Sequence, residues 1–331
     1  MGTNFFEISP VLQSVVAVVE ASRTVRMNPD EIRRVASWMA YEEFGIPGAL
    51  LQFDMGTDID VLTDMIMLAN SLNFAYTDFD TSVRFEVEYQ GRRWVDADGM
   101  AASFDRALRA GVPILDGAWM ANLTRRDLEE LFTGNIEMPM LDERVAILNE
   151  LGATLVELYG GRFSNWARTC ERAIYADGNG LLERMIVDFP RFNDVTTYRG
   201  HEVKLFKLGQ LGLWALHAMY VHLGVPGLRD LNRMSAFADY IVPVALRVMR
   251  IIEYSDDLED RISRGVEIPR DSDDEIEIRA HALYATALLT EACNELRPPE
   301  LQLVIPQIDY RLWKSYHVTH RPHHLTRTVM Y

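Results

Sequence analysis

The sequence is poor in cysteine and has no long apolar run. Its 331 residues include two cysteines, Cys170 and Cys293, which stand far apart. A disulfide framework and a thiolate zinc site are therefore excluded, and we expect a reducing compartment, the cytoplasm. No stretch reaches the roughly 18 uninterrupted apolar residues of a membrane helix, and the N-terminus lacks the basic start of a signal peptide. We expect no membrane partner.

Basic residues are also scarce. Lys and Arg total 33 against 49 for Asp and Glu, which gives a formal net charge of −16. Such a charge repels a long phosphate backbone, and no block of Lys and Arg offsets it. A nucleic-acid duplex is therefore not an expected partner, whereas a small nucleotide is compatible with this charge.

Several sequence devices of common enzyme classes are missing. The chain has no Gly-rich phosphate loop, no nucleophile elbow and no Cys/His zinc pattern. Classes of enzyme that depend on those devices are excluded.

The patterns that are present indicate a mainly helical protein. Alternating residues at 83–89, the pair Gln90-Gly91 and the segment 93–95 predict a β-hairpin. No linker, composition shift or internal repeat divides the chain, so we expect a single domain over 1–331, mainly α with a small antiparallel sheet. Apolar periodicity predicts helices at 32–39, 60–71, 100–110, 125–132, 141–159, 166–173, 180–188, 205–223 and 275–296.

Residues 239–260 place a lone carboxylate and a carboxylate cluster at opposite ends of one predicted helix. Pro243 suits a first helical turn. Asp239 would then lie at the helix entrance, where unpaired N–H groups and the helix dipole favour an ionised acid that can face a developing cation. A plain N-cap is the alternative. Apolar residues continue the helical spacing at Val244, Val248, Ile251, Ile252 and Leu258.

The cluster itself reads Asp256-Asp257-Leu258-Glu259-Asp260. It satisfies the Asp-Asp-x-x-Asp pattern with which isoprenoid synthases hold magnesium on a diphosphate, since carboxylates at these steps converge on one side of a helix. A solvated helix end and a direct ligand contact are the alternatives. The remainder of the chain offers no second magnesium-binding helix.

Lys204 and Lys207 are candidate cations in an otherwise apolar stretch. Lys207 begins a run that should be buried, so its ammonium needs a carboxylate or ligand partner, for which Asp239 is a candidate. Snorkelling to solvent is the alternative.

A second basic group lies near the C-terminus. It could bind an anion such as phosphate, coordinate a metal or simply form a surface cluster, and the nearby Pro322 makes a rigid metal site a poor fit. Its members are His317, His320, His323, His324, Arg321 and Arg327.

Aromatic residues in irregular segments are the better candidates for stacking on a flat base. Residues 73–79 read as a loop with exposed rings or a short strand, and the last segment carries Tyr310. We therefore select Phe74 and Tyr310 as stacking candidates.

A series of short motifs runs in order from Asn73 to the last residue, and in it the chain resembles the queuosine salvage protein family, the queuosine 5′-monophosphate N-glycosylases (hydrolases). The motifs are Asn73-Phe74, Gly111–Ile114, Glu143-Arg144 with Ile147–Glu150, Gly160-Gly161-x-Phe163, Phe189-Pro190 with Asp194–Thr196, Phe206-Lys207 with Gln210, Phe237–Tyr240 with Pro243, Tyr254–Leu258, Glu277–Arg279, Asp309-Tyr310 with Leu312-Trp313, Arg327 and Tyr331.

The resemblance implies an enzyme that hydrolyses the N-glycosidic bond of queuosine 5′-monophosphate and releases queuine for reinsertion into transfer RNA. It implies a helical fold related to the helix-hairpin-helix DNA glycosylases, whose Lys and Asp map onto Lys207 and Asp239. No cofactor or metal is expected, and we expect a monomer. A magnesium-dependent synthase and a non-catalytic binder of modified bases are the alternatives.

Residue roles follow from the resemblance together with the chemistry of the bond. Asp239 would stabilise the cationic ribose or orient water, and Lys207 would orient Asp239 or contact the nucleotide. The other candidates would contact the substrate: Phe74 or Tyr310 would stack on the base, Asp256 and Asp257 would bind its polar groups, and His324 and Arg327 would hold the phosphate. Asp309 and Lys204 are further substrate-binding candidates. The chain departs from the family pattern at Leu208-Gly209, where a basic residue is expected, and at His323-His324-Leu325.

Overall fold

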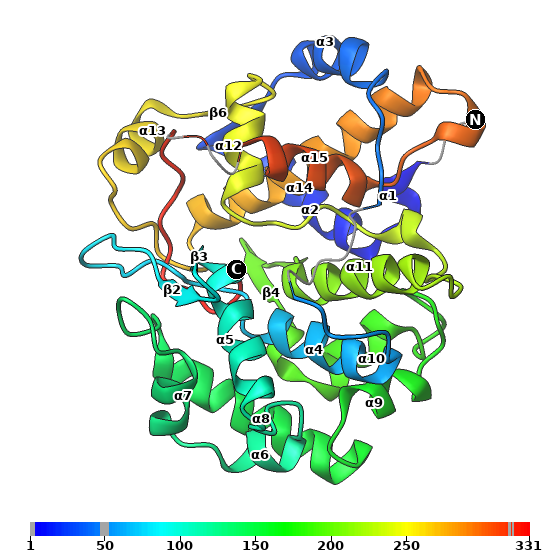
Figure 1. Cartoon of the computed structure of the whole chain (residues 1–331). Coiled ribbons are helices and arrows are strands. Elements are labelled where there is room, and N and C mark those ends of the chain that lie inside the picture. Colours follow the sequence, from blue (N-terminus) through cyan, green and yellow to red (C-terminus); the bar gives the residue numbers. More distant parts are fainter. Residues whose placement is uncertain (1–3, 47–52, 317–318, 320) are drawn as a thin grey trace.

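The computed structural model describes residues 4–46, 53–316, 319 and 321–331, and helices dominate them (Figure 1). The helices are α1 (Phe5–Ile8), α2 (Pro10–Ala21), α3 (Pro29–Met39), α4 (Ile59–Ser71), α5 (Ala97–Arg109), α6 (Gly117–Asn122), α7 (Arg125–Leu131), α8 (Leu141–Tyr159), α9 (Phe163–Thr169), α10 (Leu181–Asp188), α11 (Lys207–His222), α12 (Ile241–Val248), α13 (Asp256–Ser263), α14 (Asp273–Glu295) and α15 (Ile305–Tyr316). The prediction of a mainly helical protein is confirmed.

Strands are short and pair only two at a time in the described part of the chain. Every pair is antiparallel: β1 (Val25–Met27) with β6 (Ile252–Tyr254), β2 (Glu86–Tyr89) with β3 (Arg92–Val95), and β4 (Val195–Tyr198) with β5 (His201–Lys204). The predicted hairpin is the β2–β3 pair. Its turn residues Gln90 and Gly91 both have positive φ, 51° and 72°, as a tight two-residue hairpin turn requires.

The predicted helix over 239–260 is wrong. It divides into α12, strand β6 and α13, and Arg250 between α12 and β6 has a φ of 63°. Ile252 pairs with Met27 of β1, far away in the sequence. Short apolar runs with β-branched residues suit a strand as well as a helix, and here a distant partner strand decides between them.

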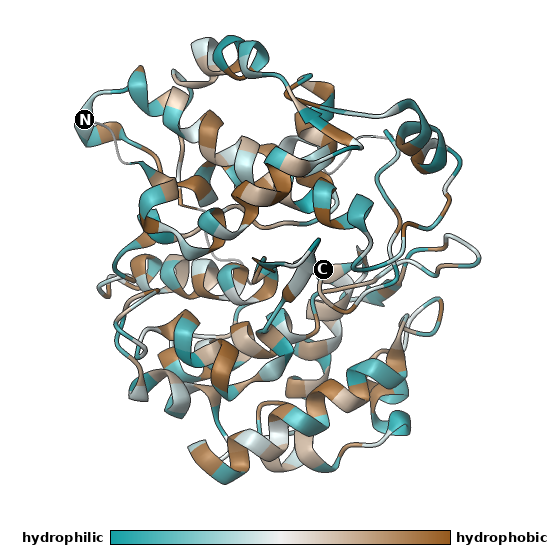
Figure 2. Cartoon of the chain, turned by 180° about the vertical axis from the view of Figure 1, so that it is seen from behind, coloured by the Kyte–Doolittle hydropathy of each residue, from teal (hydrophilic) through white to brown (hydrophobic). Residues whose placement is uncertain are grey.

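Buried apolar side chains form two clusters among the described residues. The larger cluster joins α2 with α4–α11, and the smaller cluster joins α3, α12, β6, α13 and α15. Figure 1 shows α3, α12, α13 and α15 of the smaller cluster in the upper part of the molecule and α4–α10 of the larger cluster in the lower part, with the C-terminus between these two groups. Figure 2 shows hydrophobic and hydrophilic residues alternating along the outer helices, as expected for helices with one buried face.

Helix α14 contributes to both clusters through opposite faces. A helix that is apolar on two opposite faces lies at the centre of the protein. The charged side chains that α14 also carries are therefore buried with it. Ile276, Ala280, Leu283 and Ala287 lie in the larger cluster, and Ile278, Ala282, Ala285, Leu289 and Cys293 lie in the smaller one.

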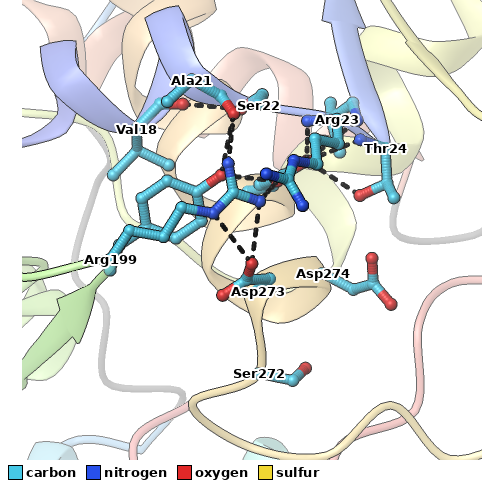
Figure 3. A network of polar contacts seen from close by, with 12 residues as sticks. Val18, Ala21, Ser22, Arg23, Thr24, Arg199, Ser272, Asp273 and Asp274 are labelled. Carbon is cyan, nitrogen blue, oxygen red and sulfur yellow. Dashed lines mark hydrogen bonds and ion pairs between the residues drawn. The ribbon is translucent and has the colours of Figure 1, made fainter.

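A polar network at the start of α14 ties three distant segments together (Figure 3). Glu277 accepts hydrogen bonds from the backbone N–H of Thr24 at 2.7 Å and from the hydroxyl of Tyr198 at 2.7 Å. Arg199 donates to the carboxylate of Asp273 at 2.8 Å. The network therefore fixes α14 against the segment before β1 and against the β4–β5 turn.

None of the described helices is both long enough and apolar enough to cross a bilayer.

Candidate active site

Asp239 lies just before α12, with its carboxylate bonded to the first turn of that helix. Its Oδ1 accepts hydrogen bonds from the backbone N–H groups of Ile241 and Val242, each at 2.9 Å. The residue is only 8% exposed. Two N–H donors and the positive end of the helix dipole favour the ionised carboxylate. The predicted position of Asp239 at the helix entrance is thus confirmed. A plain N-cap would make the same two hydrogen bonds, so they fit the cap alternative as well.

Lys207 begins α11 and is buried, so the snorkelling alternative does not hold. Burial lowers the pKa of its ammonium to about 8, although the negative charges of Asp239 and Asp309 oppose this shift. The predicted partnership of Lys207 with Asp239 is therefore present as an electrostatic interaction.

Asp309 completes the cluster from α15. Its Oδ1 accepts a hydrogen bond from the backbone N–H of Phe237 at 2.8 Å. Burial and the neighbouring charge of Asp239 raise its pKa well above that of an ordinary aspartate. Two carboxylates with different surroundings can divide the tasks of charge stabilisation and proton donation between them.

The exposed loop predicted for Phe74 is wrong. Phe74 is 1% exposed, and the guanidinium carbons of Arg144 and Arg191 lie 4.1 Å and 5.1 Å from its ring centroid. Arg144 is drawn inward because it donates to the carbonyl of Leu72 at 2.7 Å and to that of Ala75 at 2.8 Å. Phe74 is consequently a core residue covered by cations.

Tyr310 lies on α15 and not in an irregular segment, which corrects that prediction. Its ring is half-buried and stacks on Trp313, with centroids 6.3 Å apart. The α15 helix thus brings Asp309 to the cluster and leaves Tyr310 partly accessible.

Asp256 and Asp257 lie exposed in the first turn of α13. Asp257 pairs with Arg261 at 2.9 Å, and Asp260 pairs with Arg264 at 3.0 Å. No group of three or more potential metal ligands occurs among the residues that the structure describes. The exposed positions of Asp256 and Asp257 fit the alternative of a solvated helix end.

The C-terminal His cluster is only partly described, since His317 and His320 lie outside the described residues. His324 is buried beside the hydroxyl of Tyr331, at 3.1 Å. Burial and the positive charges of neighbouring groups lower its pKa to about 3, so it is neutral at physiological pH. His323 packs against Tyr240, with ring centroids 4.5 Å apart.

The remaining predicted cations lie nearer the surface. Arg327 is half-exposed, lies 4.2 Å above the ring of Phe79 and is 3.9 Å from Glu267. Lys204 lies on β5 and pairs with Glu202 at 3.3 Å. Asp239, Lys207 and Asp309 are therefore the candidates that the fold joins electrostatically.

Charged residues inside α14 were not selected from the sequence. Glu275, Glu277 and Arg279 are each at most 2% exposed. A signal was available, because these charges occupy alternate positions at the start of a helix that is otherwise apolar on two faces.

Comparison with known proteins places the chain in a family. The family model described as Queuosine salvage protein matches residues 54–331. Three relatives named queuosine 5′-phosphate N-glycosylase/hydrolase align over nearly the whole chain. The Sphaerobacter thermophilus protein is 33% identical over 97% of both chains. The Bos taurus protein is 25% identical over 96% of this chain and 98% of its own, and the Schizosaccharomyces pombe protein 25% over 92% and 91%. This chain belongs to the queuosine salvage protein family.

Proposed function

We propose that this protein hydrolyses the N-glycosidic bond of queuosine 5′-monophosphate and releases queuine, with ribose 5-phosphate as the second product. The family and the names of its relatives support the substrate. The observation that carries the proposal is the buried Asp239 carboxylate, bonded to two N–H groups of α12 beside Lys207. Queuine set free in this way is available for reinsertion into transfer RNA.

Asp239 acts on the ribose. Breaking the bond from ribose to base develops positive charge on the sugar, and a fixed ionised carboxylate stabilises that charge or orients the attacking water. Its hydrogen bonds from α12 hold it in place before the reaction, and Lys207 supplies a positive charge that keeps it ionised in a dry site.

Asp309 acts on the departing base. The 7-deazaguanine base lacks the N7 acceptor through which a purine is usually protonated, so assistance must reach another atom. Because the pKa of Asp309 is raised, the carboxyl can keep a proton and donate a hydrogen bond to the base while Oδ1 accepts from Phe237.

Contacts further out are assigned by charge and exposure. Arg327 is half-exposed and always charged, so we assign it, with Lys204, to the phosphate, whereas His324 is neutral and supports the C-terminal segment. The exposed Asp256 and Asp257 are assigned to the cationic amine of queuine, and the accessible Tyr310 to the base.

We also propose a single domain over 1–331 that acts as a monomer in the cytoplasm. The sharing of α14 by both clusters supports the single domain, and the two free cysteines are typical of a reducing compartment. A relationship to the helix-hairpin-helix DNA glycosylases is proposed from α11, the turn at Gly224 and the Asp-led α12.

The test is to incubate the purified protein with queuosine 5′-monophosphate in the presence of EDTA and to assay free queuine by mass spectrometry. Wild-type protein should release queuine. Asp239→Asn should lower kcat at least about 100-fold, because it removes the charge while keeping the shape of the side chain. Asp260→Asn, which removes an exposed carboxylate of α13, is the matched control and should keep wild-type kcat.

Two results would contradict the proposal. Unimpaired turnover by Asp239→Asn would remove this residue from the mechanism. Bound nucleotide without any release of queuine by the wild type would indicate a binding protein.

A further inference from the structure

Arg279 of α14 is a buried cation that contacts several separate segments. It is 2% exposed, and its Nη2 donates to Asp194 Oδ2 at 2.5 Å. Its Nε donates to the carbonyl of Ala238 at 3.1 Å, and its guanidinium carbon lies 4.5 Å from the ring centroid of Tyr331. Few side chains could hold all these partners, because only arginine presents a rigid fork of five N–H donors.

One of these contacts holds the segment of Asp239. Ala238 directly precedes Asp239, so the bond to Arg279 fixes the carbonyl of the peptide that joins the two residues. Two residues before Asp239, the N–H of Phe237 is bonded to Asp309. The backbone that carries the proposed catalytic carboxylate is thus held from α14 and from α15.

The partner of Arg279 holds the segment of Lys207. The backbone carbonyl of Asp194 accepts hydrogen bonds from the N–H of Leu205 at 2.9 Å and from that of Phe206 at 3.3 Å. These two residues directly precede Lys207. The Asp194 side chain therefore faces Arg279 while its main chain fixes the entrance of α11.

A second bridge joins the same two segments. The Gln210 side chain accepts from the backbone N–H of Ser235 at 2.8 Å and donates to the carbonyl of Leu205 at 3.2 Å. Gln210 lies one turn after Lys207, and Ser235 lies four residues before Asp239. Because the amide bridge contains neither Arg279 nor Asp194, it can keep the segments folded together when the ion pair is altered.

We infer that the Asp194–Arg279 pair sets the position of Asp239 relative to Lys207, so that both members are positioning residues for the proposed reaction. This inference depends on the proposed function. A buried ion pair adds little stability compared with an apolar pair of the same volume, so a role in geometry explains its presence better than a role in stability. Displacement of a catalytic group by about 1 Å can lower a rate about 100-fold.

The inference is tested with Asp194→Asn and Arg279→Lys. Asn keeps the shape of Asp194 without its charge, and Lys keeps the charge of Arg279 without the fork. Each variant should lower kcat for queuine release about 10- to 100-fold while KM changes less than about threefold, because the substrate contacts remain. Rates are compared at a temperature where circular dichroism shows every variant to be folded.

Glu277→Gln is the matched control. Glu277 is an equally buried charge on the same helix, but its bonds lead to Thr24 and Tyr198 and not to the segments of Asp239 or Lys207. This variant should lower Tm and keep wild-type kcat. A double variant with both Asp194→Asn and Arg279→Lys should be little slower than the slower single one, since the two residues act as one unit.

The outcomes separate this inference from the proposed function. Wild-type kcat in folded Asp194→Asn, or an increase in KM alone, would overturn the inference while the proposed function stands. The inference would also be overturned if the fold-losses in kcat of the two single variants multiplied in the double variant, because the residues would then act independently. If the wild type releases no queuine, the proposed function fails first.

Discussion

Asp239 and Lys207 are both buried, and their opposite charges attract each other. Asp239 accepts two hydrogen bonds at the entrance of α12, and Lys207 is only 6% exposed. The requirement that a buried ammonium must meet a carboxylate was sufficient to pair them. Phe74 shows the opposite case, because an aromatic residue in a loop turned out to be buried under Arg144 and Arg191.

The titration of Lys207 leads to a prediction at the scale of the residue. Its ammonium has a pKa of about 8 in the folded protein, against 10.5 for an ordinary lysine. We expect kcat to fall as pH rises through about 8, since deprotonation removes the positive charge beside Asp239. Lys207→Arg, whose guanidinium does not titrate in this range, should lose this alkaline limb at whatever activity remains. A limb near pH 8 that persists in Lys207→Arg would belong to another group.

The stability of the folded protein should rise with pH where kcat falls, because of the same lowered pKa of Lys207. A lowered pKa means that the unfolded chain binds the proton more tightly than the folded one between pH 8 and 10.5. Burying the charged ammonium therefore costs stability below pH 8, and the cost is relieved as pH rises through that interval. Urea denaturation of wild type and Lys207→Arg from pH 7 to 9 should show this difference in slope.

The close packing of α6 against α8 requires a glycine at position 152. A Cβ atom added to Gly152 would lie 2.2 Å from the backbone nitrogen of Ala121 and 2.6 Å from the carbonyl oxygen of Gly117. Both contacts are with main-chain atoms, so the helices would have to move apart. Gly152 is thus required by the close approach of two helices and not by its own backbone conformation.

Gly152→Ala should therefore destabilise the fold by about 1–3 kcal/mol, the usual cost of overpacking, and lower Tm by several degrees. The matched control is Gly212→Ala in α11, where the added Cβ would meet Asn70 at an ordinary 3.5 Å and the better helix propensity of alanine should keep or raise Tm. Thermal unfolding followed by circular dichroism compares the two variants. An unchanged Tm in Gly152→Ala would mean that the α6–α8 contact is more adaptable than its geometry indicates.

At the scale of the molecule, the C-terminal segment connects the two clusters. Arg191 donates to the carbonyl of Val329 at 2.5 Å, and Ile268 donates to that of Leu325 at 2.8 Å. Tyr331 lies under the guanidinium of Arg279, with its hydroxyl 3.1 Å from His324. Segments far apart in the sequence thus meet at the last residue (Figure 1).

Removal of the Tyr331 ring should accordingly affect both stability and activity. Tyr331→Ala should cost about 3 kcal/mol through the cavity it leaves, and it should lower kcat because Arg279 loses the ring beneath it. Tyr331→Phe keeps the ring and loses only the hydroxyl contact, so its kcat should stay near that of the wild type. Denaturant melts together with the queuine assay make the comparison, and equal kcat in the Ala and Phe variants would argue against a supporting role for the ring.

Local patterns determined the elements whose periodicity is long and uniform. The prediction for 141–159 coincides with α8, and the alternation around Gln90-Gly91 identified the β2–β3 hairpin, because both depend on neighbours within a few residues. The placement of Asp239 before an apolar helix was likewise readable from the chain. Such features require no knowledge of distant contacts.

Tertiary structure alone decided the features that depend on distant partners. Ile252 is in a strand because Met27 pairs with it, and Phe74 is buried because the carbonyl groups around it draw Arg144 inward. The link from Ala238 through Arg279 to Asp194 joins three separate parts of the chain. Periodicity along the sequence contains no information on which remote donor meets which acceptor, so the sequence determined the candidate residues and the fold determined how they are joined.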